Sequence, residues 1–304
     1  VADVEGYYEN AKINRVYVDR VHVKKAFAEY TAAYNADDPK IKLKIDHTYR
    51  VAALCERIAK AAGMCAYDVE LAWLSGMLHD VGRFEQIKRY NTFSDADSVD
   101  HAKFGADLLF KDGLISTFLN GMVKCTGYKP GALEDRYSSD GVFLYDRLNK
   151  SDMEMLELAI RCHNMYRIPQ GLNRREQAFC NVLRDADKVD IFKVNIDTPL
   201  EEIYNTTTEE LMKSDITDEV LEAFDEEHCI LKAIRCTPAD TVIGHVSLAY
   251  ELVYDESVRI TVEQGYLAKL MHFHSDNEET NRKMAMVREK MDSYVKKRIG
   301  EKDA

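Results

Sequence analysis

The sequence has little of what a turn-rich fold needs. Its 304 residues include only 14 glycines and 5 prolines, too few for a barrel or sandwich with many tight turns. No segment longer than about six residues alternates strictly between apolar and polar side chains, as a half-exposed strand would. Apolar residues recur instead at helical spacing, so we predict an all-α fold.

Long apolar runs, paired cysteines and an excess of basic charge are also missing. There is no 18-residue apolar run and no basic-then-apolar leader, and the seven cysteines form no CxxC pair, which is typical of reduced thiols inside cells. Lysine and arginine number 41 against 53 aspartates and glutamates, a net charge of −12. We therefore expect a cytoplasmic protein that binds neither extended nucleic acid nor membranes.

One stretch, LAWLSGMLHDVGRFEQ (residues 71–86), begins as a helix with almost no polar face and then places His79 beside Asp80. A helix that is apolar all round is buried, and Gly82 is positioned to end it. An ionised carboxylate in such surroundings is costly unless it is paired or bound to a metal. This stretch therefore predicts a buried functional group at Asp80.

Histidines and carboxylates recur on the apolar faces of five predicted helices. Each one alone has an ordinary interpretation as a hydrogen-bonded core residue, which we keep for His245. Together, inward-facing imidazoles and carboxylates from several helices are how helical bundles build metal sites. The set consists of His47, His79, Asp80, His101, His163 and Asp187.

The order of these residues resembles the HD-domain superfamily of metal-dependent phosphohydrolases. The resemblance rests on DHTYRVA (46–52), MLHDVGRFEQIKRYNTFSDADSVDHAKFGADLL (77–109), LAIRCHN (158–164) and RDADKVDIF (184–192), which look like segments of one bacterial subgroup. The segment CHNMYRIPQG lacks the Gly-Tyr-Pro signature of the cyclic-di-nucleotide phosphodiesterase branch. We predict a single HD-type domain over residues 1–304, with its motif-bearing core at about 40–195 and a helical C-terminal extension at about 200–300.

The resemblance implies roles for individual residues. It makes His47, His79, Asp80 and Asp187 metal ligands, with Asp80 able to bridge two ions. His101 and His163 match the additional histidines of two-metal members, so Asp80, His101 and His163 are the expected catalytic residues. The ligand types suit one or two divalent ions among Mn, Fe, Co, Ni, Zn and Mg.

The resemblance also implies hydrolysis of a phosphoester in a small molecule, with a nucleotide as the favoured substrate, by metal-activated water. The expected substrate-binding residues are Arg50, Arg83, Gln86 and Arg89, and the segment 84–100 is positioned to cover a substrate. Monoesterase and diesterase activity both stay open, as does assembly into a homo-oligomer. The alternatives are a di-iron HD-type oxygenase and a non-catalytic module that binds a phosphorylated ligand.

The two acids of RDADKVD should differ. Asp187 shares a helical stripe with Cys180 and Leu183, which predicts an inward side chain and a metal ligand. Asp185 lies nearer Asn181 and Lys188 on a mixed face. We expect Asp185 to be a surface or helix-flanking carboxylate.

Overall fold

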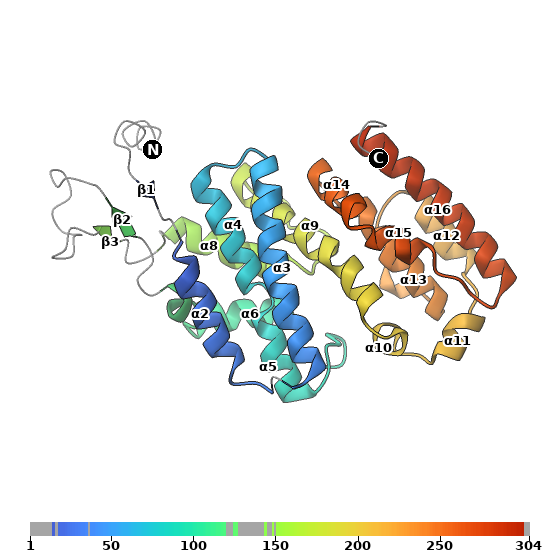
Figure 1. Cartoon of the computed structure of the whole chain (residues 1–304), viewed down its shortest axis with the longest axis horizontal. Helices are drawn as coiled ribbons and strands as arrows, with labels where there is room; N and C mark the ends of the chain where they lie inside the picture. The colour runs from blue at the N-terminus through green and yellow to red at the C-terminus, as the bar shows by residue number, and fades with distance from the viewer. Residues whose placement is uncertain are drawn as a thin grey trace. The chain divides into compact units, whose positions relative to one another are not determined.

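A computed structural model describes residues 14–15, 18–35, 37–119, 124–126, 143–144, 148 and 150–300. Helices dominate these ranges, which confirms the predicted all-α class (Figure 1). The extended elements found in the described ranges are three short strands that pair antiparallel in the order β1-β2-β3. They are β1 (Asn14–Arg15), β2 (Lys124–Thr126) and β3 (Phe143–Leu144).

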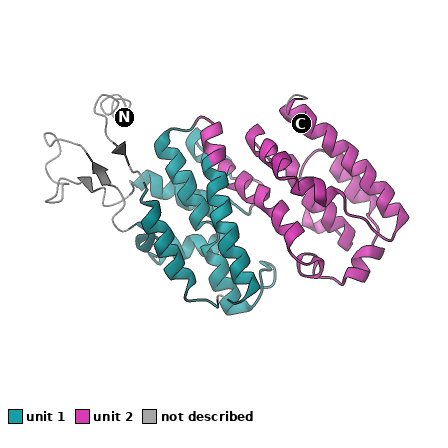
Figure 2. Ribbon diagram, viewed as in Figure 1, with its two compact units in different colours: residues 1–56, 64–164, 169–180 teal, residues 57–63, 165–168, 181–304 magenta. Residues whose placement is uncertain are grey.

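The chain divides into two compact units (Figure 2). Unit 1 comprises residues 1–56, 64–164 and 169–180, and unit 2 comprises residues 57–63, 165–168 and 181–304. Both helix α3 (Pro39–Ala61) and helix α9 (Arg174–Asp197) contribute residues to each unit. The single domain expected from the sequence stays a prediction.

Unit 1 contains the helices that carry most of the motif residues. Besides its parts of α3 and α9, these are α2 (Arg20–Thr31), α4 (Ala66–Leu78), α5 (Val81–Tyr90), α6 (His101–Ala106), the π-helical turn η1 (Asp107–Lys111), α7 (Ile115–Leu119) and α8 (Lys150–Cys162).

Helix α4 is the buried helix that the sequence predicts. Every side chain from Leu71 to Leu78 is buried. A Cβ added at Gly76 would lie 2.6 Å from the Ala52 Cα, so the missing side chain lets α4 approach α3 closely. This contact brings the end of α4, where His79 follows, toward the helix that carries His47.

Gly82 does not end that helix, and this expectation was wrong. Helix α4 ends at Leu78 and Gly82 lies in the first turn of α5. A Cβ on Gly82 would lie 2.5 Å from the carbonyl oxygen of His101 and 2.7 Å from the Gly105 nitrogen. Gly82 is therefore needed for the close packing of α5 on α6, which positions His101.

Unit 2 is also helical in its described residues. It contains the later part of α9, α10 (Leu200–Tyr204), α11 (Thr208–Lys213), α12 (Asp218–Asp225), the 3₁₀ turn η2 (Lys232–Ile234), α13 (Pro238–Val246), the 3₁₀ turn η3 (Ser247–Glu251), α14 (Asp255–Gln264), α15 (Tyr266–Met271) and α16 (Glu278–Ile299). Across the described part of the chain, no helix combines the length and apolar character that crossing a membrane requires.

Asp185 is fully buried in unit 2, so the expected surface position was wrong. Its carboxylate accepts hydrogen bonds from the backbone N–H groups of Val253 (2.9 Å) and Tyr254 (2.9 Å) and from the Ser257 hydroxyl (2.7 Å). These donors stand at the start of α14 and have no partner within that helix. Asp185 thus caps a helix that begins about 70 residues further along the chain, a contact that a helical wheel of α9 does not reveal.

Candidate metal centre

Four histidines surround the Asp80 carboxylate inside unit 1. His47 comes from α3, His79 and Asp80 join α4 to α5, His101 is the first residue of α6, and His163 directly follows α8. All five side chains are buried. We call these five residues the His/Asp cluster.

Each oxygen of Asp80 faces a different pair of histidines. Oδ2 lies 3.5 Å from the Nε2 atoms of both His47 and His79, whereas Oδ1 lies 3.5 Å from Nε2 of His101 and 3.8 Å from Nε2 of His163. Within the pairs, the Nε2 atoms are 3.3 Å apart for His47 and His79, and 3.1 Å apart for His101 and His163. Asp80 is therefore shared by two three-residue groups, each able to hold a metal ion.

Hydrogen bonds at Nδ1 fix the tautomer of three of the imidazoles. Nδ1 lies 2.7 Å from the Gly76 carbonyl oxygen in His79 and 2.7 Å from the Ile160 carbonyl oxygen in His163. In His101 it lies 2.7 Å from Oδ2 of Asp95. These oxygens only accept, so Nδ1 carries the proton and Nε2 presents its lone pair.

Converging lone pairs fit a bound cation. Two neutral Nε2 acceptors 3.1 Å apart cannot hydrogen-bond to each other, and a metal ion would satisfy both. The Asp80 Oδ1 atom is buried and accepts no hydrogen bond within the described residues. The donor set of imidazole nitrogens and carboxylate oxygens matches ions from Mn to Zn.

The charges in the centre favour a neutral His101 and an ionised Asp80. Burial, together with the nearby Arg83, lowers the pKa of His101 to about 4 in spite of Asp95. Burial alone would raise the pKa of Asp80, but the positive charge of Lys44 and other neighbours holds it well below its usual range. Both groups are thus in the state that ligates metals at neutral pH.

Arg83 and Gln86, both expected to bind substrate, hold the segment 92–99 in place. The Arg83 Nη1 donates to the Phe93 carbonyl oxygen (2.7 Å) and to Oδ1 of Asp95 (2.9 Å). Gln86 is fully buried, and its amide donates to Asp95 Oδ1 (3.0 Å), the Ser98 hydroxyl (2.9 Å) and the Val99 carbonyl (3.0 Å). Their direct contact with substrate stays a prediction, and their observed role is to position Asp95 against His101.

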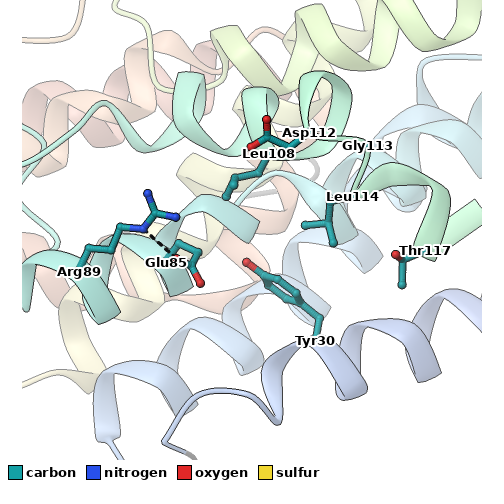
Figure 3. Close-up of a pocket in the computed structure, with 8 residues that line it drawn as sticks. All are labelled: Tyr30, Glu85, Arg89, Leu108, Asp112, Gly113, Leu114 and Thr117. Carbon is teal, nitrogen blue, oxygen red and sulfur yellow. Dashed lines mark hydrogen bonds and ion pairs between the residues drawn. The ribbon is translucent and has the colours of Figure 1, made fainter.

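Arg89 lies in a different part of unit 1. Its Nε donates to Oε2 of Glu85 at 2.9 Å, and both side chains line a pocket (Figure 3). No residue of the His/Asp cluster lines that pocket, which is bounded by Tyr30, Glu85, Arg89, Leu108, Asp112, Gly113, Leu114 and Thr117. None of the other predicted substrate-binding residues lines this pocket, and the role of Arg89 stays a prediction.

The predicted roles of two further residues, Arg50 in substrate binding and Asp187 in metal binding, stay predictions. Arg50 lies on α3 three residues after His47, on the adjoining turn. Asp187 lies on the part of α9 that belongs to unit 2 and is partly exposed.

Sequence reasoning missed Lys44. Its Nζ lies 2.6 Å from Oδ2 of Asp80, and its side chain is 17% exposed. The spacing in the sequence could have indicated it, because Lys44 precedes His47 by three residues and the two therefore share a face of α3. In the run PKIKLKID, however, Lys44 is one of three alternating lysines that resemble a solvated surface.

Comparisons with known proteins agree with this geometry. The family model described as "HD domain" matches residues 45–236, more than half of the 304-residue chain, and the matched span includes all six predicted metal ligands. Searches of curated proteins and of solved structures gave no match. The chain belongs to the HD-domain family, and thus to a superfamily of metal-dependent phosphohydrolases.

Proposed function

We propose that this protein hydrolyses a phosphoester of a small molecule, with a nucleotide as the favoured substrate. The ligands would be the His/Asp cluster and Asp187, holding one or two divalent ions. The observation that carries the proposal is the sharing of Asp80 between two histidine pairs, each 3.5–3.8 Å from one carboxylate oxygen. A carboxylate placed between two sets of ligands is suited to a two-metal centre for in-line phosphoryl displacement.

When bound, divalent ions supply Lewis acidity: they lower the pKa of water from 15.7 toward about 7 and offset phosphoryl charge. The protein contributes the geometry. Gly76 and Ile160 carbonyl groups keep the Nε2 lone pairs of His79 and His163 directed at the site. Asp95 does the same for His101 and is itself fixed by Arg83.

Local charge supports a phosphorylated substrate. The whole chain has a net charge of −12, yet Lys44 lies at 2.6 Å and the Arg83 Nε at 3.8 Å from the two oxygens of Asp80. With the charge of Asp80 offset by bound metal, a phosphate group would meet these two cations, whereas an extended polyanion would meet a repelling surface. The nucleotide assignment further depends on the family resemblance of the motif segments.

The test is a panel of nucleotides, an aryl phosphate and phosphodiesters, assayed with Mn, Fe, Co, Ni, Zn and Mg. We expect phosphate release that requires metal, stops with a chelator and is lost in Asp80→Asn. The control is His272→Ala, since His272 is an exposed histidine of unit 2. The relative rates on the monoesters and diesters in the panel decide which bond is cleaved.

Two outcomes would replace the proposal. A metal-loaded protein that is inert on the panel, but binds a phosphorylated ligand after chelation, would be a non-catalytic binding module. Bound iron with substrate-dependent oxygen uptake, and no phosphate release, would indicate a di-iron oxygenase.

A further inference from the structure

The ammonium group of Lys44 contacts a carboxylate oxygen that a bound metal ion would also contact. This ammonium group lies 2.6 Å from Oδ2 of Asp80, the oxygen that His47 and His79 approach at 3.5 Å. An ammonium group and a divalent ion at one carboxylate oxygen repel each other. Occupation of the His47–His79 side should therefore weaken or break the Lys44–Asp80 ion pair.

Lys44 differs from the neighbouring Arg83 in its partners. Arg83 would keep its counter-charge when metal binds, because its Nη1 donates to Asp95 at 2.9 Å. The same Nη1 also donates to Gln86 and to the Phe93 carbonyl oxygen. For Lys44, Asp80 is the one hydrogen-bonding and ion-pairing partner found among the described residues, and the Phe93 ring lies 5.6 Å from its Nζ. If the ion pair with Asp80 broke, the mostly buried ammonium group of Lys44 would have no anionic partner among the described residues.

We propose that Lys44 exchanges one partner for another. In the metal-free protein it neutralises Asp80, and once metal occupies Asp80 it binds a phosphate oxygen of the substrate. The second half of this proposal rests on the proposed function. Lys44 is then a substrate-binding residue, and also the group that sets how tightly the centre holds metal.

The chemistry of the side chain suits both roles. An ammonium on a flexible four-carbon stem offers three donors and can turn toward a new acceptor without moving its helix. A phosphate dianion supplies the charge that Asp80 would no longer offer. Arg83, fixed by three acceptors, has no such freedom.

Metal affinity tests the first half. Calorimetric titration of metal-free Lys44→Met with Mn²⁺ should show binding at least about tenfold tighter than wild type, because a repelling charge is gone. Lys44→Arg, which keeps the charge, should stay close to wild type. The control is Lys42→Met, since Lys42 is an exposed lysine of the same helix. Unchanged or weaker metal binding in folded Lys44→Met would overturn this half.

Inorganic phosphate tests the second half without requiring turnover. Titrated into metal-loaded protein, phosphate should bind Lys44→Met about 10–100-fold more weakly than wild type or Lys42→Met, the range expected for a hydrogen bond to a charged group. Equal phosphate affinity would refute the substrate role, even in a protein that hydrolyses nothing on the panel. Turnover that is normal in Lys44→Met would refute it equally while leaving the proposed function intact.

The wild-type protein provides a measurement that does not depend on the folding of a variant. Amine labelling followed by mass spectrometry should find Lys44 more reactive when metal is added and protected again by phosphate. Lys42 should react alike in all three conditions. Constant labelling of Lys44 would contradict the exchange of partners.

Discussion

Replacing Asp185 with alanine should destabilise unit 2 without removing Asp187, the residue of that unit that we propose as a metal ligand. The Asp185 carboxylate accepts from the backbone N–H groups of Val253 and Tyr254 and from the Ser257 hydroxyl, all at 3.0 Å or less. An unsatisfied buried donor costs about 1–3 kcal/mol, and loss of a helix cap costs about 0.5–2 kcal/mol. Burial raises the pKa of Asp185, so the cost of desolvating its charge offsets part of the stability that these hydrogen bonds provide.

The expected net loss is therefore about 1–4 kcal/mol, a substantial part of the roughly 5–15 kcal/mol that stabilises a typical domain. Urea unfolding followed by circular dichroism measures it, with metal content measured on the folded variant. Asp197→Ala is the control, because this aspartate lies on the same helix, is half exposed and pairs with Lys193. Asp185→Ala as stable as the control would refute the capping argument, and a folded but metal-free Asp185→Ala would refute the assignment of the ligand to Asp187.

Three further outcomes are expected. Asp80→Asn should lose metal from both groups, whereas His163→Ala should lose one ion of two by elemental analysis; equal losses would mean a single site. Gly82→Ala should be destabilised by about 1–3 kcal/mol in thermal unfolding, since its Cβ would meet the His101 carbonyl at 2.5 Å, and a wild-type melting temperature would show that α5 can move away. Burial, together with Arg235, lowers the pKa of His245 to about 3. The unfolded state therefore binds a proton at this histidine below about pH 6.5, whereas the folded state does not until the pH approaches 3. The free energy of unfolding should fall as the pH is lowered between these two values. His245→Phe should lower the acid midpoint of unfolding, and an unchanged midpoint would assign the acid sensitivity to other groups.

The helices and the His/Asp cluster could be predicted because their signals are local. The apolar run before His79 predicts a buried helix, and α4 is one. The stripe that carries His47 predicts an inward imidazole, and His47 is buried. Each of these inferences needs only the 3.6-residue period and the cost of burying a polar group.

The roles of Asp185, Lys44 and Gly82 were not predicted because they depend on contacts between distant segments. The donors of Asp185 come from residues 253–257, so its own helix gives no sign of them. Lys44 meets Asp80 across 36 positions of sequence, and Gly82 is required by the backbone of α6 rather than by the end of its own helix. Sequence periodicity assigns the face on which a side chain lies, but the partner on that face belongs to the tertiary structure.

The interleaving of the two units bears on how this protein can be divided. The chain passes from one unit to the other at 56/57, 63/64, 164/165, 168/169 and 180/181. Residues 57–63 belong to unit 2, and their Arg57 pairs with Glu256 and Glu263 of α14 at 2.7 Å. A fragment ending at residue 180 would keep Arg57 but remove both of its partners. Truncation or exchange at any single point between 57 and 180 would therefore separate residues of unit 1 from one another and residues of unit 2 from one another.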